Sequence, residues 1–212
     1  MLRFSRDLAT THVPVILTAL LLLAIGYLLG AIPSGYLAGR WLKGIDLRDC
    51  GSGSTGATNV LRNVGKGPAL VVFLIDVGKG ALAVLLAKSV GLSDWLQVLA
   101  GLASLAGHIW PVWLGWKGGK AVATGLGMFL GLAWPVGLAC FGLFMGVISI
   151  FRIVSLSSVV AAIGLPLLML AYGSSSAYMV VSLVASLMVL WRHRSNIQRL
   201  LAGNEPKIGQ KF

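Results

Sequence analysis

The sequence predicts an all-α protein, a polytopic membrane bundle of seven transmembrane helices that forms one domain over residues 1–212. Three observations predict it. Charged residues make up only 11% of the chain and hydrophobic residues 57%, whereas a soluble domain carries about 25% charged residues. Apolar runs recur along the chain at the length of roughly 20 residues that a helix needs to cross a bilayer. Lysine and arginine gather in alternate loops between these runs, as they do in multi-pass membrane proteins.

The seven apolar segments are bounded by residues that end or interrupt helices. They cover residues 13–39, 68–90, 95–114, 119–133, 135–151, 154–172 and 177–191. The first segment lacks a convincing cleavage site and is expected to stay as a helix. The breaks from the second segment onward are Gly91 to Asp94, Lys117 to Lys120, Trp134-Pro135, Arg152 and Gly173 to Ser176. The short, glycine-rich segment 119–133 leaves a tilted helix, a thinned bilayer and a re-entrant segment as alternatives.

Cationic residues set the expected orientation of the bundle. If the helices alternate in direction, one side of the membrane holds Arg40, Lys43, Arg48, Arg62, Lys66, Lys117, Lys120, Arg152, Arg192, Arg194, Arg199, Lys207 and Lys211. The other side holds Arg3, Arg6 and Lys88. The positive-inside rule places the richer side in the cytoplasm, so the N-terminus is expected outside and the C-terminus inside. The same rule accounts for the net charge of +11, and no nucleic-acid partner is expected.

A glycine-rich loop, GSGSTGATNVLR, occupies residues 51–62. Its Gly51-x-Gly53-x-x-Gly56 spacing matches the dinucleotide fingerprint, but that fingerprint needs a soluble βαβ unit, which the composition excludes. Backbone N–H groups that no Cβ shields can instead form an anion nest. Further donors are the hydroxyl groups of Ser52, Ser54, Thr55 and Thr58 and the planar guanidinium of Arg62. The alternative is a flexible reversal whose Arg62 meets lipid phosphates.

A second cationic segment favours the interpretation that it and the glycine-rich loop both bind anions. Lys117-Gly118-Gly119-Lys120 is expected on the same side of the membrane as the glycine-rich loop. Neither segment is a phosphate loop of the ATP-hydrolysing kind, because Ala57 follows Gly56 where that motif has lysine.

Two ionisable residues stand inside the second apolar segment. Asp76 and Lys79 are one helical turn apart, and such residues in a membrane helix are usually paired or functional. We expect an ion pair that faces the bundle interior and supports the site. His108 is expected to be an interfacial hydrogen-bonding residue within an aromatic belt that includes Trp110 and Trp113.

Further polar residues lie near the ends of the later helices. His193 is followed three residues later by Asn196 on the same helical face, an arrangement that can grip a phosphorylated polyol. Ser155, Ser157 and Ser158 follow Arg152 at a helix start, where helix caps are expected. No Ser-His-Asp order, zinc-spaced Cys/His set or pair of carboxylates is apparent, and no cofactor or metal is expected. The chain offers anion-binding groups and few candidate bases.

Taken together, these motifs resemble one family. The segments GSGSTGATNVLR, D-x-x-K-G, GHIWPVWLGWKGGKAVAT, SLSS and RHRSNIQRLLAGNEPK occur in this order, within a match that spans residues 24 to 207. Their combination is similar to the bacterial acyl-phosphate:glycerol-3-phosphate acyltransferases. The resemblance implies a seven-helix enzyme of the bacterial inner membrane. It would transfer an acyl chain from acyl phosphate to the 1-hydroxyl of sn-glycerol 3-phosphate, giving lysophosphatidic acid and inorganic phosphate.

The resemblance also implies roles for matching positions. Ser52 and the glycine-rich loop would belong to the acyl-phosphate site, Arg62 and Lys120 would hold phosphate charge, and Ser158 would contribute to the site. His193 and Asn196 would place the acceptor. The expected phosphate-binding set is Gly51, Gly53, Ser54, Gly56, Thr58, Asn59, Gly118 and Gly119, and the supporting pair is Asp76 and Lys79. The implied partners are both substrates, membrane lipid and a functional link to the enzyme that makes acyl phosphate.

The sequence departs from the family pattern at two places. The family loop reads GSGN-x-GATN, whereas Ser54 and Thr55 stand here in place of asparagine and an apolar residue, and KGGKG ends here in Ala121. The first change trades one donor for another and bears on donor affinity. A phosphate-recognising transporter or channel subunit is the alternative function, and it would need a polar path with ionisable residues near the membrane midplane.

Overall fold

The computed structural model describes the backbone of residues 4–210 and the side chains of residues 15–210. Every regular element in that range is a helix. The side chains of Arg3, Arg6 and Lys211, which entered the charge count above, lie outside the described residues. The α-helices are α1 (Phe4–Ala31), α2 (Ser34–Lys43), α3 (Ala57–Asn63), α4 (Lys66–Ser89), α5 (Asp94–Ile109), α6 (Val122–Leu132), α7 (Trp134–Phe151), α8 (Val154–Tyr172), α9 (Ser176–Arg192) and α10 (Arg194–Leu201). Two 3₁₀ turns, η1 (Leu47–Asp49) and η2 (Val112–Leu114), lie in the loops.

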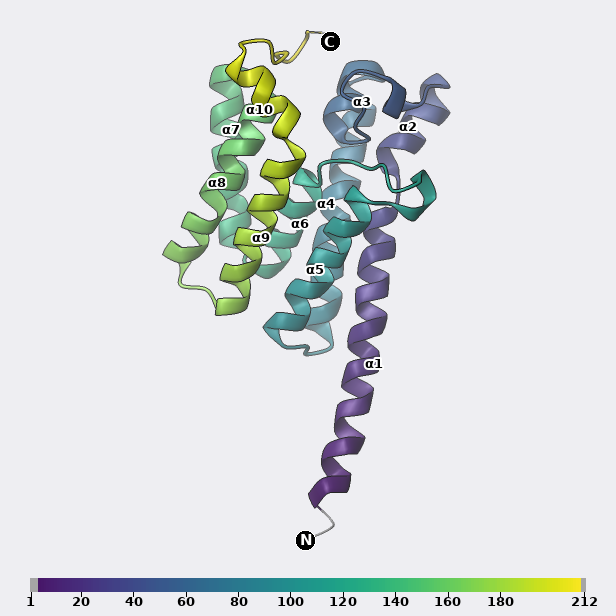
Figure 1. Cartoon of the computed structure of the whole chain (residues 1–212), viewed down its shortest axis with the longest axis vertical. Coiled ribbons are helices and arrows are strands. Elements are labelled where there is room, and N and C mark those ends of the chain that lie inside the picture. The colour runs from purple at the N-terminus through teal and green to yellow at the C-terminus, as the bar shows by residue number, and fades with distance from the viewer. Residues whose placement is uncertain (1–3, 211–212) are drawn as a thin grey trace.

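The long helices run along a common axis, with α1 extending past the rest of the bundle (Figure 1). The two chain ends lie at opposite ends of the molecule (Figure 1). The short helices α2, α3 and α10 gather at the end that carries the C-terminus (Figure 1), so the glycine-rich loop and the C-terminal segment come to the same end of the bundle.

Within the described residues, five segments are long and apolar enough to cross a membrane, and the pair α9–α10, bent by 62°, makes a sixth if it is taken as one span. The expected fourth span is the exception, because α6 has only 11 residues. At roughly 1.5 Å per residue it covers about half of a hydrocarbon core about 30 Å thick. Large apolar side chains face outward, as at Leu17 (61% exposed), Leu167 (65%) and Leu187 (66%). Such a surface needs lipid around it.

The first apolar segment differs from the prediction. Residues 13–39 were expected to form one helix, but α1 ends at Ala31 and α2 begins at Ser34. Pro33 explains the break, because proline has no N–H to donate and restricts the backbone of the residue before it. At the break the carbonyl oxygen of Ile32 accepts the N–H of Ser34 at 3.0 Å, and a lysine side chain from α4 also bonds to it.

Close packing holds the helices around this break. α4 packs on α6, α1 on α5, and α7 on α8, which in turn packs on α9. A Cβ at Gly127 of α6 would collide with the carbonyl oxygen of Val77 of α4. Small residues permit such approach of backbones and are common where membrane helices associate. The short α6 is therefore held tightly against α4, with its N-terminal end beside the loop that carries Lys120.

Candidate active site

A cavity of about 210 Å³ lies between α3, the loop before α6, α8, α9 and the C-terminal segment. Its polar lining comes from Ser52, Ser54, Thr58, Asn59, Arg62, Asp76, His108, Lys120, Ser155, Ser158, Ser186, His193, Asn196 and Glu205. All six residues expected to carry the chemistry are in this set. The remaining lining is mainly apolar and comes from several helices, including Phe129 of α6, Phe141 of α7 and Leu165 of α8. One cavity thus joins a polar end to an apolar one.

Asn59 organises the glycine-rich loop. Its side-chain amide donates to the carbonyl oxygens of Leu47, Cys50 and Ser54, each at 2.9 Å, and its Oδ1 accepts from the backbone N–H of Ser52 at 3.3 Å. Only 1% of Asn59 is exposed. This side chain therefore shapes the loop from within, and its donors are committed to loop carbonyls.

The loop has the backbone that an anion nest requires, but some of its N–H groups already have partners. Gly51 and Gly53 have φ values of 56° and 66°, which favour glycine. The N–H of Gly53 donates to Cys50 at 3.0 Å, and that of Gly56 donates to the Ser54 hydroxyl at 3.4 Å. Hydroxyl groups consequently make up much of what this loop offers to the cavity.

The two glycines before Lys120 are bonded to the end of α5. The N–H of Gly118 donates to Ile109 at 3.0 Å, and that of Gly119 donates to His108 at 3.1 Å. The carbonyl of Gly119 also accepts from Arg192 at 2.9 Å. These glycines hold the loop in place, and within the loop it is the side chain of Lys120 that lines the cavity.

Lys120 belongs to a hydrogen-bond network in the wall of the cavity. Its ammonium donates to Oδ1 of Asn196, whose amide donates to Glu205 at 2.6 Å. The same carboxylate accepts from Ser155 at 2.8 Å and from Arg199 at 2.7 Å. The polar groups of the loop, α8, α10 and the C-terminal segment are therefore linked through Glu205.

Burial, neighbouring charges and hydrogen bonds shift the pKa values of Lys120 and Glu205, two ionisable members of this network. Burial lowers the pKa of Lys120 from 10.5 to about 8; Glu205 opposes the shift, while Arg199, Arg192 and Arg62 add to it. Burial alone would raise the pKa of Glu205, but hydrogen bonds from Asn196, Ser155 and Arg199 outweigh it and keep that pKa below its ordinary value. At neutral pH the wall thus carries an ammonium and a carboxylate.

Glu205 is a site residue that the sequence analysis did not assign. It is 7% exposed and lies in the quoted motif RHRSNIQRLLAGNEPK, but as one of several scattered carboxylates it had no separate signal. Pro206, the residue after Glu205, also reaches the site, since its carbonyl oxygen accepts a hydrogen bond from Arg62 at 3.3 Å. The C-terminal segment therefore contacts both the network and a predicted phosphate-binding arginine.

His193 presents a defined ring face. Its Nδ1 lies 2.8 Å from the carbonyl oxygen of Val189, and because a carbonyl only accepts, Nδ1 carries the proton. In the neutral ring, Nε2 is then a hydrogen-bond acceptor. His193 is 3% exposed and lines the cavity, at the junction where α9 meets α10.

The serines at the start of α8 do not cap it, contrary to expectation. Ser157 and Ser158 donate back to the carbonyls of Ile153 and Val154, at 3.0 and 2.9 Å, and Ser155 bonds to Glu205. Serine hydroxyls can bond to the carbonyl four residues earlier within a helix, and that option is taken here. Ser155 and Ser158 still line the cavity.

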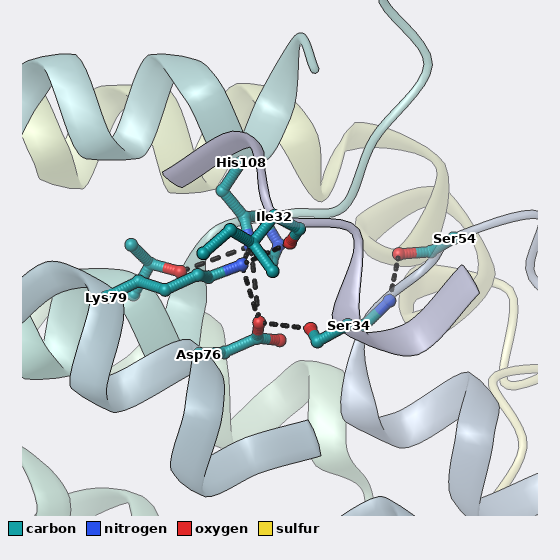
Figure 2. Close-up of polar contacts among 8 residues, drawn as sticks. Ile32, Ser34, Ser54, Asp76, Lys79 and His108 are labelled. Atoms are coloured by element: carbon teal, nitrogen blue, oxygen red, sulfur yellow. Dashed lines mark hydrogen bonds and ion pairs between the residues drawn. The ribbon is translucent and has the colours of Figure 1, made fainter. Parts of the chain in front are cut away.

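Figure 2 shows a second polar cluster, of which Asp76 and His108 also line the cavity. Asp76 and Lys79 form the expected ion pair at 2.7 Å and are 1% and 4% exposed. Figure 2 shows Ser34 directed at the same carboxylate, to which it donates at 2.6 Å. Lys79 also donates to the carbonyl oxygen of Ile32 at 3.0 Å. The pair thus faces the bundle interior, as predicted.

His108 is placed differently from the prediction. It was expected at the interface, but it is 8% exposed and its Nδ1 lies 3.3 Å from Lys79 Nζ and 3.2 Å from Thr124 Oγ1. The position near the end of α5 is interfacial along the helix axis, but the ring turns inward because Lys79 and Thr124 supply polar partners there. His108 is therefore part of the buried cluster.

Comparisons with known proteins agree on one family. A sequence model described as glycerol-3-phosphate acyltransferase matches residues 20–203. The glycerol-3-phosphate acyltransferase of Parasynechococcus marenigrum (strain WH8102) is 90% identical over 211 residues, which cover 100% of both chains. That of Prochlorococcus marinus (strain MIT 9313) is 70% identical over 194 residues, which cover 90% of this chain and 95% of the relative.

Two crystal structures share the fold. Both are of PlsY (YgiH), an integral membrane glycerol 3-phosphate acyltransferase, in a glycerol 3-phosphate form and a lysophosphatidic acid form. Their TM-scores are 0.86 and 0.83 at 42% and 40% identity; both comparisons cover 90% of this chain, and 96% and 95% of the other. The likeness supports a multi-pass membrane helix bundle and favours an acyltransferase over a transporter or channel subunit.

Proposed function

The chain belongs to the glycerol-3-phosphate acyltransferase family, and we propose that it takes its acyl chain from acyl phosphate. The acceptor is the 1-hydroxyl of sn-glycerol 3-phosphate, and the products are lysophosphatidic acid and inorganic phosphate. The observation that supports this most is the single cavity with a cationic polar end and an apolar end. Both proposed substrates carry phosphate, and the donor also carries an acyl chain, so both ends of the cavity are used.

The polar end divides between the two substrates. Ser52, with the hydroxyls of Ser54 and Thr58, binds the phosphate of the donor, and Arg62 shares that charge. Lys120 and Asn196 bind glycerol 3-phosphate, whose phosphate displaces their present contact. Asn59, Gly118 and Gly119 keep the loops in shape, as their internal hydrogen bonds suggest.

The apolar end takes the acyl chain. Its aromatic lining includes Phe73 of α4 and Phe141 of α7, whose ring centroids are 6.3 Å apart. A chain held between helices keeps its hydrocarbon out of water, at about 0.8 kcal/mol for each buried CH₂. The reacting carbonyl then lies where the apolar lining meets the polar one, beside His193 and Ser158.

The reaction needs positioning more than a nucleophilic residue, because acyl phosphate is already an activated mixed anhydride. The 1-hydroxyl oxygen attacks the acyl carbon, the bond from that carbon to the phosphate oxygen breaks, and the departing phosphate accepts the hydroxyl proton. His193, through Nε2, and Ser158 orient the acceptor. The phosphate oxygen travels with the reacting carbon, so no separate base has to be aligned.

We also propose the sidedness given by the charges, with seven crossings, the N-terminus outside and the active end in the cytoplasm of a bacterial cell. α6 would be the short fourth crossing. Cytoplasmic placement suits a functional link to the enzyme that makes acyl phosphate. A single reporter cysteine at residue 174 should react from outside intact cells, and one at residue 204 only after permeabilisation. The reverse pattern would refute this orientation.

The donor is tested with purified protein in detergent. Release of inorganic phosphate is followed with acyl phosphate plus glycerol 3-phosphate, and lysophosphatidic acid is measured with acyl-CoA in place of acyl phosphate. We expect turnover with acyl phosphate alone. Comparable turnover with acyl-CoA would refute the choice of donor and leave the acceptor site standing.

A further inference from the structure

The buried cluster of Ser34, Asp76, Lys79, His108 and Thr124, called here the core network, contacts the glycine-rich loop at one end. Ser34 donates to Asp76, and the next residue, Gly35, packs its backbone on the loop. A Cβ at Gly35 would collide with the carbonyl oxygen of Thr55. The placement of the glycine-rich loop against α4 therefore depends on the bond from Ser34 to Asp76.

The other end of the core network contacts the loop that carries Lys120. The Nδ1 side of the His108 ring meets Lys79 and Thr124, while its Nε2 lies so close to Gly119 that a Cβ there would collide with it. The carbonyl of His108 also accepts the N–H of Gly119. Lys120 is the next residue, so the ring of His108 is the surface on which its loop rests.

Charge and burial make the core network stiff. Asp76 and Lys79 balance each other's charge while they are almost fully buried, and Lys79 also bonds to Ile32 and contacts His108. A buried polar group with a missing partner is costly in a low-dielectric interior, so a network of this kind resists rearrangement. A rigid connection between two loops fixes the distance between them.

We propose that Asp76, Lys79 and His108 are positioning residues that hold the glycine-rich loop and the Lys120 loop at a fixed spacing across the cavity. The inference rests on the proposed function, which places one phosphate on each loop. Displacement of a binding group by about 1 Å, caused by a change remote from the chemistry, can cost a hundredfold in rate. The core network acts through the loops, and each of its ends serves a different substrate.

The two ends can be separated by variants. His108→Asn keeps an amide near the position of Nδ1 for Lys79 and Thr124, but it removes the atoms that support Gly119. We expect the KM for glycerol 3-phosphate to rise on the order of tenfold to a hundredfold, with the KM for acyl phosphate unchanged. Ser34→Ala removes the hydrogen bond to Asp76 at the other end of the core network and should raise the KM for acyl phosphate alone. Calorimetric titration with glycerol 3-phosphate checks the His108→Asn result without turnover.

A charge-balanced double variant separates positioning from mere stability. Asp76→Asn or Lys79→Met alone leaves one buried charge without its partner and should lower the thermal midpoint strongly. Asp76→Asn with Lys79→Met removes both charges, so the midpoint should recover while both KM values stay raised. The matched control is Tyr178→Phe, which removes a 2.7 Å bond to Gln97 at the opposite end of α5. It should shift the midpoint and leave both KM values unchanged.

The outcomes are distinct. Wild-type KM values in both His108→Asn and the double variant would overturn the inference, as would a KM rise in Tyr178→Phe that follows its loss of stability. If the wild-type protein does not turn over acyl phosphate, the proposed function itself has failed. Calorimetry on glycerol 3-phosphate then still reports whether His108 supports that site.

Discussion

The two ends of the bundle use polar side chains in different ways. At the end away from the cavity, Lys88 donates to the carbonyls of Gly131 and Leu132, at 2.7 and 2.9 Å, where α6 ends. Gln97 donates to Leu92 at 2.6 Å at the start of α5. These donors satisfy backbone carbonyls near helix ends, which helices leave without internal partners. Neither residue lines the cavity.

At the cavity end, one set of polar side chains meets other side chains. Lys120, Asn196 and Glu205 bond in series along a wall that a ligand can reach. A phosphate can take over such contacts, whereas a donor that completes a helix end cannot be released without loss of stability. The comparison indicates that a lysine whose partner is a side chain in the cavity wall, as at Lys120, is available to a ligand, whereas Lys88 completes a helix end.

The largest effect on activity is expected at the phosphate-binding cations. Arg62→Ala and Lys120→Ala should each lower kcat/KM by about one to two decades, since a hydrogen bond to a charged group contributes roughly 1.5–3 kcal/mol. Arg62→Lys should recover little if the guanidinium holds phosphate through two bonds. Steady-state rates and thermal midpoints measured together check this. Near-wild-type rates in both alanine variants would place the chemistry elsewhere.

A smaller effect is expected at His193. His193→Gln keeps a hydrogen-bonding group but cannot titrate, so it should lose less than about tenfold in kcat if the departing phosphate takes the proton, and His193→Ala should lose more. General-base catalysis is typically worth about a hundredfold to ten-thousandfold. A loss of that size in His193→Gln, with unchanged affinity for glycerol 3-phosphate and the acidic limb of the pH–rate profile gone, would identify His193 as the base.

The next effect is a modest dependence on pH. The pKa of Lys120 lies near 8, below its ordinary 10.5, because of burial. The ammonium is therefore present below that pH and is lost as the pH rises through it. The KM for glycerol 3-phosphate should rise several-fold between pH 7 and pH 9, over which the phosphate stays doubly charged because its second pKa is about 6. Lys120→Arg stays cationic and should flatten the profile; an equally steep profile in that variant would assign the limb to another group.

The smallest effect on activity is expected at the opposite end of the bundle. Lys88→Met leaves the two α6 carbonyls without their donor, so unfolding should become easier by roughly 1–3 kcal/mol. Both KM values should stay at wild-type level. A raised KM in this variant, at a temperature well below its midpoint, would remove the distinction between the two ends.

The sequence predicted the helices better than the details of their ends. Apolar runs locate membrane helices because the bilayer demands both length and apolarity, and each predicted run lies mainly in helix. Hydropathy alone did not show the break at Pro33, since Pro33 lies within a run that is mostly apolar. The cationic motifs were expected on one side, and the structure brings them to one cavity.

Residues whose roles depend on distant partners were predicted less well. His108 was expected at the interface because its neighbours in sequence are tryptophans, while its actual partners lie 29 and 16 positions away, at Lys79 and Thr124. A helix cap was expected from the group Ser155, Ser157 and Ser158, yet Ser155 bonds to Glu205, 50 positions later. Single-sequence patterns report local periodicity, and these contacts are set by the way the helices pack.

The claim that one cavity at the polar end carries the reaction is tested most directly by measuring both products at once. Purified wild-type protein receives acyl phosphate and glycerol 3-phosphate, and the Arg62→Ala, Lys120→Ala double variant is assayed beside it. We predict lysophosphatidic acid and inorganic phosphate in equal amounts from the wild type, and at least a hundredfold loss of both in the double variant with its thermal midpoint retained. Equal rates of product formation by the two proteins would contradict the account.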